Sequence, residues 1–241
     1  MINYKLTIKY IGTRYHGWQR QPKHISIQQV IEEQLEKLFK QKIRLIAAGR
    51  TDAGVHALGQ VANFKVNHHR KPETILNFLN ANLPRDISIV SVEEVPLSFN
   101  ARFSAKGKSY LYKIHQFPDP FLYGFSWYIS KKLDILKLNQ ALEIIKQHKN
   151  LISLAKKGDY LREEIDIREI RIKYDGVHIN IEISASHFLR NMVRKIVAHS
   201  VHVALGSLSL QQLEEIIKAK DPAKGIYTAP PEGLYLKEVY Y

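Results

Sequence analysis

One short segment brings together three side chains that can do chemistry. Arg50, Asp52 and His56 fall within seven residues of one another, between two apolar stretches. A carboxylate can act as a nucleophile or a general base, an imidazole can transfer protons, and a guanidinium binds anions. Gly49 and Gly54 flank the carboxylate and permit tight backbone turns. The segment therefore predicts a loop that a ligand can approach closely.

This loop does not match the common binding loops. A Walker A loop needs Gly-Lys-Ser/Thr, and an EF-hand needs several carboxylates where this loop has one. A purely structural interpretation is also open: Asp52 would accept a backbone N–H in an Asx-turn, and Arg50 would be a solvated neighbour. The residue types alone do not decide between a structural loop and a catalytic one.

The composition excludes several kinds of chemistry. The chain has 241 residues and no cysteine, so thiolate catalysis and thiolate metal sites are excluded. The histidines 187, 199 and 202 form no His-Glu-x-x-His pattern and offer no third ligand in register, so neither a metal nor another cofactor is expected. No apolar run approaches the roughly 18 residues of a membrane span, and the first ten residues lack a signal-peptide core. We expect a cytoplasmic protein without a membrane partner.

The charge indicates a polyanionic partner. The chain carries 36 Lys+Arg and 23 Asp+Glu, a formal net charge of +13. A positive field of this kind attracts nucleic acid, anionic membranes or acidic proteins.

The first half of the chain predicts the elements that position the Asp52 loop. A capping box at Ser26 and Gln29 starts one helix, and Pro72 starts a second. Alternating or apolar stretches predict strands at residues 1–10, 43–48, 61–66 and 87–95. The resulting β-α-β-β-α-β order is the ferredoxin-like split βαβ pattern.

The second half predicts a similar unit. A strand is expected at 103–116, a helix capped by Asp134, a hairpin at 165–185 with a type I′ turn at Asp175-Gly176, helices from Phe188 to Leu205 and from Ser209, and a strand at 234–239. Residues 146–164 are interpreted as a basic surface loop. We therefore expect an α+β protein of two ferredoxin-like, RRM-like units, 1–98 and 99–241. Their strands would form one mostly antiparallel sheet with helices on one face.

Residues 49–57, Gly-Arg-Thr-Asp-Ala-Gly-Val-His-Ala, resemble the signature of the TruA family of tRNA pseudouridine synthases. Further stretches resemble that family's other blocks in the same order, namely residues 15–21, 80–84, 99–105, 108–112, 188, 192–194 and 232–236. The resemblance spans about residues 3–240, with departures at Ile11 and at 150–154. It implies the pseudouridine synthase fold, a homodimer, and cofactor-free isomerisation of uridine at positions 38, 39 and 40 of the tRNA anticodon stem-loop.

The resemblance also implies roles for single residues. Asp52 becomes the essential carboxylate, acting either as a nucleophile or as a base that abstracts a proton. Arg194 becomes the cation of an ion pair that keeps Asp52 charged. Tyr110 would stack on the flipped uracil, whereas Tyr112, on the same strand, is interpreted as a core aromatic. Substrate contacts are also implied for Arg50 and Leu234.

Basic residues spread along the chain are candidates for phosphate contacts to tRNA. These are Arg14, Arg20, Lys23, Arg70, Lys71, Lys106 and Lys108. The alternative function is a non-catalytic protein that binds structured RNA through ferredoxin-like units. Such a binder needs aromatic RNP motifs, which the sequence lacks, and it does not need Asp52.

Overall fold

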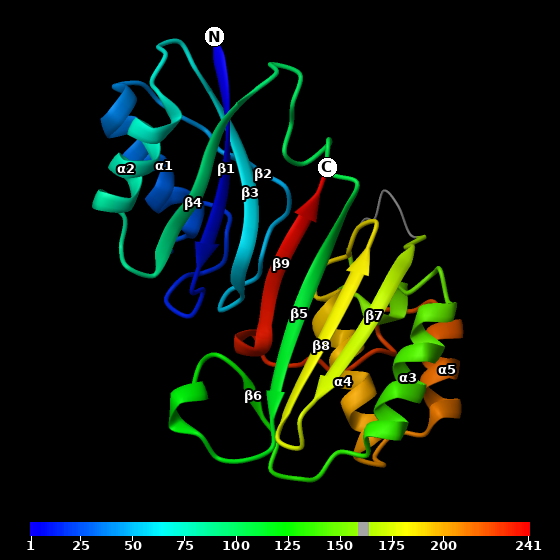
Figure 1. The fold of residues 1–241 in the computed structure, drawn as a ribbon. Helices are drawn as coiled ribbons and strands as arrows, with labels where there is room; N and C mark the ends of the chain where they lie inside the picture. The colour runs from blue at the N-terminus through cyan, green and yellow to red at the C-terminus, as the bar shows by residue number, and fades with distance from the viewer. Residues whose placement is uncertain (159–163) are drawn as a thin grey trace. The chain divides into compact units, whose positions relative to one another are not determined.

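The computed structural model describes residues 1–158 and 164–241, and the chain forms two compact units. Unit 1 consists of Met1–Lys106 together with Tyr235–Tyr241, and unit 2 consists of Gly107–Leu234. Both units combine strands and helices (Figure 1), so the predicted α+β class is confirmed. Among the described residues, every helix falls short of the length and hydropathy that crossing a bilayer requires.

Unit 1 has the predicted β-α-β-β-α-β order and gains one strand from much later in the chain. Its elements are β1 (Ile2–Tyr10), α1 (Ile27–Phe39), β2 (Ile46–Ala47), β3 (His56–Val66), α2 (Pro72–Asn82), β4 (Ile87–Val95) and β9 (Leu234–Tyr240). The strand order is β4-β1-β3-β9, and β2 also pairs with β3. β1 runs antiparallel to β3 and β4, whereas β9 runs parallel to β3.

The core of unit 1 forms where α1 packs on the sheet. Tyr4, Leu6 and Ile8 alternate with polar residues along β1 and are fully buried. Phe39 from α1 packs against Tyr4 and Phe64, with ring centroids 6.3 and 5.8 Å away. α1 and α2 lie beside each other (Figure 1). Burial of this aromatic cluster fixes α1 against β1 and β3, the two strands that adjoin the Asp52 loop.

Two strands of unit 1 differ from the prediction. β3 begins at His56 rather than at residue 61, because Ala57 and Gln60 already pair with β1. The loop that carries Asp52 therefore ends at Val55. The strand expected at 43–48 contains only the two residues of β2, because the N–H of Leu45 donates to a side chain of α1 instead of to a strand.

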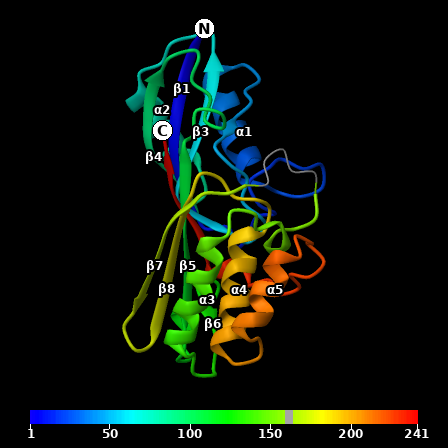
Figure 2. The same ribbon diagram turned by 90° about the vertical axis from the view of Figure 1, so that its right-hand side faces the viewer.

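Unit 2 packs three helices against a set of paired strands. Its elements are β5 (Gly107–His115), β6 (Trp127–Tyr128), α3 (Ile135–Gln147), β7 (Ile167–Tyr174), β8 (His178–Ala185), α4 (Met192–Ala204) and α5 (Leu210–Lys218). β5, β8 and β7 pair antiparallel in that order, and β6 pairs parallel to β5. Figure 2 shows α3, α4 and α5 side by side on one face of these strands.

Three local predictions in unit 2 are wrong at their boundaries. β5 begins at Gly107 rather than at residue 103. α4 begins at Met192 rather than at residue 188, because Asn191 adopts the left-handed conformation, with φ 60°. The hairpin turns one residue later than predicted. The N–H of Asp175 donates to the carbonyl of His178, so Gly176 and Val177 are the two central residues of the turn, and Gly176 has φ 99°. That geometry is typical of a type II′ turn rather than type I′.

The segment interpreted as a basic surface loop is partly core. Leu151, Leu154 and Ala155 are fully buried, and Ile152–Leu154 forms a 3-10 turn. Apolar side chains at these positions explain why the segment turns inward. Residues 159–163 of the same segment lie outside the described residues.

Candidate active site

Asp52 is the first residue of a β-turn in unit 1, which spans residues 52–55. The N–H of Val55 donates to the backbone carbonyl of Asp52 at 3.2 Å, and Gly54 has φ 78°. A positive φ at the third position is what a type II turn requires, and glycine adopts it at little cost. Gly49 does not adopt a positive φ, and its carbonyl accepts from Gln60 Nε2 at 2.8 Å. Asp52 is half-buried in this turn.

Neighbouring segments fix the residue before Asp52. The backbone carbonyl of Thr51 accepts from the N–H of Trp18 at 3.1 Å. The Thr51 hydroxyl lies 2.7 Å from the hydroxyl of Tyr10, at the end of β1. Both Thr51 and Tyr10 are buried, so their hydrogen bonds are shielded from water. The residue before Asp52 is therefore held both by the end of β1 and by the loop that follows it.

Gly17 lies directly against the backbone of residues 51–53, at the start of the Asp52 turn. Its φ is 84°, and a Cβ at this position would lie 2.6 Å from the Thr51 carbonyl oxygen and 3.1 Å from the Asp52 carbonyl carbon. Both contacts are shorter than van der Waals distance, and backbone atoms cannot rotate away as a side chain can. Any larger residue at position 17 must displace residues 51–53.

We expect Gly17→Ala to lower both stability and activity. Its matched control is Gly176→Ala, since Gly176 also has positive φ (99°) but has nothing within 4 Å of the added Cβ. The control should lose about 1–2 kcal/mol, a melting-temperature decrease of roughly 2–8 °C, with unchanged activity. Gly17→Ala should lose more stability and also react more slowly at temperatures where it is folded. Equal melting temperatures and equal rates for the two variants would contradict the close contact.

His56 and Arg50 differ in their surroundings. His56 is buried, its Nδ1 accepts from the N–H of Gly12 at 3.0 Å, and its ring stacks on Tyr235 with centroids 4.6 Å apart. Burial raises the pKa of Tyr235 to about 12. These contacts give His56 a structural role at the start of β3. Arg50, in contrast, is exposed.

Tyr110 and Tyr112 lie on β5 of unit 2. Tyr110 pairs with Ile183 of β8, and its ring meets Phe188 edge-on at 5.0 Å. Tyr112 is fully buried, and its hydroxyl donates to the carbonyl of Pro230 at 2.8 Å. Burial raises the pKa of Tyr112, and the negative charge of Glu232 raises it further. Tyr112 is thus a core aromatic, as the sequence suggests.

Arg194 and the segment before Leu234 are joined within unit 2. Arg194 is the third residue of α4, and its Nε–H donates to the carbonyl of Ala229 at 2.6 Å. The N–H of Ala229 donates in return to the Arg194 carbonyl at 3.1 Å. Gly233 packs directly on the Tyr112 ring, because a Cβ there would lie 2.6 Å from it. Arg194 and Tyr112 therefore both contact the segment that leads to Leu234.

Two other basic residues near Arg194, Arg190 and Lys195, have different surroundings from it. Arg190 precedes the helix, and Lys195 is not on an exposed basic face. The Lys195 ammonium donates to the carbonyl of Gly225, and burial lowers its pKa. Of these three cations, Arg190 is exposed, Arg194 is half-buried and Lys195 is buried.

The predicted phosphate-binding residues near Asp52 are all exposed. Arg14, Arg20 and Lys23 lie on the loop that follows β1. This loop is at the same end of the sheet as the Asp52 turn, because Tyr10 pairs with Ala57. Arg14 also forms an ion pair with Asp86 at 3.5 Å.

The other four predicted phosphate-binding residues do not belong to this loop. Arg70 and Lys71 follow the opposite end of β3, where Val66 pairs with Ile2. The 11 residues of β3 span roughly 35 Å, which separates this end from the turn. Lys106 is exposed, and its N–H donates to Tyr240 near the end of β9. Lys108 belongs to β5 of unit 2 and is half-buried.

Sequence reasoning missed the residues that hold the Asp52 turn. No signal in the sequence points to Thr51, Tyr10 or the backbone of Trp18. Threonine and tyrosine are common in protein cores, and a contact made by a backbone group does not depend on the type of residue. Gly17 did carry a signal, since glycine in a polar loop suggests a close backbone approach. In the described ranges, 1–158 and 164–241, no group of three metal-ligating side chains is found.

Comparisons with known proteins cover both units. A family model described as tRNA pseudouridine synthase matches residues 6–104 and 137–241. The tRNA pseudouridine synthase A of Aquifex aeolicus is 38% identical over 241 residues, covering 99% of each chain. Proteins of the same name from Acetivibrio thermocellus and Thermodesulfovibrio yellowstonii are 38% and 35% identical and align over 100% of both chains. Asp52, Arg194 and Leu234 fall inside the matched ranges, and Tyr110 falls between them.

Proposed function

Because this chain belongs to the tRNA pseudouridine synthase family and is an isomerase of tRNA uridine, we propose that it acts at positions 38, 39 and 40 of the anticodon stem-loop. The observation that carries this proposal is the Asp52 turn, in the segment that resembles the TruA signature. The related proteins are named as synthases, so the alternative of a non-catalytic RNA-binding protein is not favoured.

The reaction is an internal rearrangement. The C1′–N1 glycosidic bond breaks, the freed uracil turns, and a C1′–C5 bond forms. C5 loses its proton and N1 gains one, so no atom is added and no electron is transferred. One carboxylate suffices for this chemistry, whereas glycoside hydrolysis normally uses two.

We propose that Asp52 is this carboxylate. It could attack C1′ or the uracil ring, or it could abstract a proton from the sugar and later assist removal of the C5 proton. The half-buried side chain at a fixed backbone turn supports either role. Catalysis needs the reacting group to be held in one position. The hydrogen bonds that Thr51 forms with Trp18 and Tyr10, and the bond from the N–H of Val55 to the carbonyl of Asp52, hold the backbone at Asp52.

We propose supporting roles for residues of both units. Arg194 would supply the positive charge that pairs with Asp52, and Tyr110 would stack on the flipped uracil. Leu234 would contact the base on its other side, and Arg50 would hold the RNA backbone or help flip the base. Tyr110 already makes an edge-on ring contact with Phe188, which supports a fixed orientation of its phenol.

The tRNA contacts and the biological setting are also proposals. The exposed cations at the Asp52 end of unit 1 would bind phosphates near the flipped base. Those at the other end, roughly 35 Å away, suit a second part of a molecule as large as tRNA. We further propose a homodimer in the cytoplasm, where tRNA is found, with no cofactor.

The test uses tRNA transcripts labelled with tritium at C5 of uridine. We expect release of tritium to water from transcripts with uridine at position 38, 39 or 40. Release should be absent from a control transcript with cytidine at all three positions and compensating changes on the opposite strand. Equal release from the control would overturn the choice of positions, and no release from any tRNA would overturn the function.

A further inference from the structure

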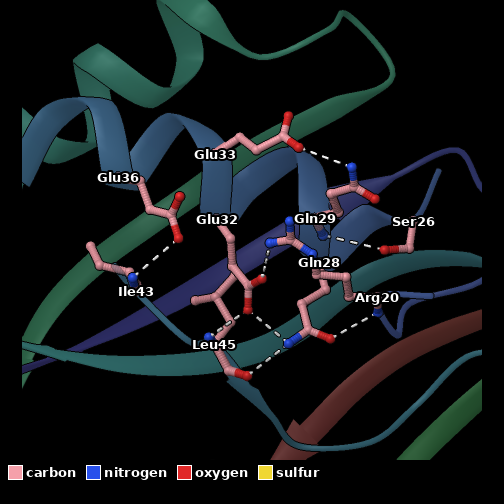
Figure 3. Close-up of polar contacts among 9 residues, drawn as sticks. All are labelled: Arg20, Ser26, Gln28, Gln29, Glu32, Glu33, Glu36, Ile43 and Leu45. Carbon is pink, nitrogen blue, oxygen red and sulfur yellow. Dashed lines mark hydrogen bonds and ion pairs between the residues drawn. The ribbon is translucent and has the colours of Figure 1, made fainter. Parts of the chain in front are cut away.

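Helix α1 carries two Gln–Glu pairs with the same chemistry and different surroundings (Figure 3). Gln28 Nε2 donates to Glu32 at 2.8 Å, and Gln29 Nε2 donates to Glu33 at 2.9 Å. Both pairs join residues i and i+4, which lie on one face of a helix. The Gln29–Glu33 pair is an exposed contact, whereas the Glu32 side chain is only 4% exposed. The Gln28–Glu32 pair also has partners outside the helix.

Glu32 accepts hydrogen bonds from three different segments of the chain. Its Oε1 accepts from Gln28 and from the backbone N–H of Leu45, the latter at 2.9 Å. Its Oε2 lies 3.4 Å from Nη1 of Arg20. A carboxylate removed from water is costly unless such donors surround it. Any movement of Leu45 or Arg20 away from Glu32 therefore has a substantial free-energy cost.

Gln28 binds the backbone of the same two segments. Its Oε1 accepts from the N–H of Arg20 at 3.1 Å, and its Nε2 donates to the carbonyl of Leu45 at 3.2 Å. Gln28 and Glu32 together thus satisfy both backbone groups of Leu45. The pair connects the loop after β1 with the segment that leads into β2.

The spacing of N–H groups along residues 43–45 matches the spacing of Glu32 and Glu36 along α1. Ile43 and Leu45 are buried, while the neighbours Lys42 and Arg44 are exposed, so the segment alternates as an extended chain does. The N–H of Ile43 donates to Glu36 Oε1 at 3.3 Å. Four helical residues rise about 6 Å and two extended residues about 6.6 Å, so Glu32 and Glu36 can reach alternate N–H groups.

At its N-terminus α1 also holds the strip Gly17–Arg20, which touches the Asp52 turn. The N–H groups of Ile27 and Gln28, which have no partner inside the helix, donate to the carbonyls of Gly17 and Trp18 at 3.2 and 3.0 Å. The N–H of Trp18 then donates to Thr51 at 3.1 Å, and Gly17 lies against the Asp52 backbone. The strip is therefore the part of the molecule between the Gln28–Glu32 pair and the turn.

We propose that Glu32, acting through Gln28 and the strip Gly17–Arg20, is a positioning residue for Asp52. The pair fixes the strip at Arg20 and fixes the segment 43–45, from which the chain continues through β2 into the Asp52 loop. Loss of the carboxylate releases both attachments, and the Asp52 carboxylate moves relative to the bound uridine. This inference rests on the proposed role of Asp52 in the reaction.

The test compares Glu32→Gln with Glu33→Gln, the same change one residue later in the same helix. At position 32 the new NH2 group cannot accept from Leu45, Gln28 and Arg20 as the two carboxylate oxygens do. We expect the single-turnover rate of tritium release, with enzyme in excess over tRNA, to fall about 10- to 100-fold for Glu32→Gln. Its Kd for tRNA and the rate of Glu33→Gln should stay within about twofold of wild type.

A second pair of variants and a thermal measurement separate positioning from stability. Gln28→Ala should slow the reaction as Glu32→Gln does, and Gln29→Ala should not. Each rate is measured well below the variant's melting temperature, so that a merely structural role leaves it unchanged. Equal rates for Glu32→Gln and Glu33→Gln, or a rate defect that disappears on cooling, would overturn the inference. An inactive wild type, or an active Asp52→Asn variant, would instead overturn the proposed function.

Discussion

Asp52→Asn is expected to abolish tritium release from tRNA, with a rate at least about 10³-fold below wild type. Asparagine has nearly the same shape, and the turn depends on the backbone carbonyl of residue 52 and on Gly54, which the substitution leaves in place. The variant therefore loses a negative charge and a basic oxygen without losing the loop. The measurement is single-turnover release together with tRNA binding, and binding should persist.

The matched control for Asp52→Asn is Asp175→Asn. Asp175 also lies in a tight turn, and its carboxylate accepts from the N–H groups of Val177 and His178, which lower its pKa to about 2. It is exposed in the hairpin of unit 2, far along the chain from the family signature. We expect this control to react at the wild-type rate. Release by Asp52→Asn at the rate of the control would remove Asp52 from the chemistry.

Arg194→Ala should cause the second-largest loss, about 10²- to 10³-fold in rate. Two effects add: the proposed positive charge beside Asp52 disappears, and the bond from Arg194 Nε to Ala229 is lost. Arg194→Lys keeps the charge but has no Nε–H in the same place, so it should retain more activity than alanine and less than wild type. The readout is again the single-turnover rate with saturating enzyme.

The control for Arg194 is Arg171→Ala, an exposed arginine of β7 that pairs with Glu169 at 2.6 Å. It should change the rate by less than about twofold, since surface ion pairs contribute little. The double variant Asp52→Asn/Arg194→Ala should be no slower than Asp52→Asn alone, because groups that act as a unit are not additive. Independent, additive losses would contradict the proposed ion pair.

The sequence predicted best those features in which a side chain hydrogen-bonds to the backbone a few residues away, such as helix caps. Asp134 and Ser209 cap α3 and α5 as the pattern indicates, and Ser209 with Gln212 forms both bonds of a capping box. At Ser26 the hydroxyl accepts from the N–H of Gln29 as predicted. The Gln29 amide donates to Glu33, so that the expected return bond is replaced by a contact within the helix.

Features that depend on distant segments could not be read in advance. Gln28 and Glu32 look like solvent-facing polar residues of an amphipathic helix, yet Glu32 directly follows the buried Ile31 and is itself buried. Its partners Leu45 and Arg20 lie 13 and 12 residues away. The early start of β3 likewise depends on pairing with β1. The chemistry of the Asp52 loop became specific only through its resemblance to a family.

The place of β9 in unit 1 has a consequence for synthesis of the protein. Tyr235 pairs with His56, 179 residues earlier in the chain. Ribosomes add about 5–20 residues per second, so β3 emerges roughly 10–35 s before the strand that pairs with it. During that interval the backbone groups of His56 and Ala57, next to the Asp52 turn, form an open sheet edge that other chains can bind. The nascent protein is therefore exposed to aggregation at the same place where the finished enzyme holds its carboxylate.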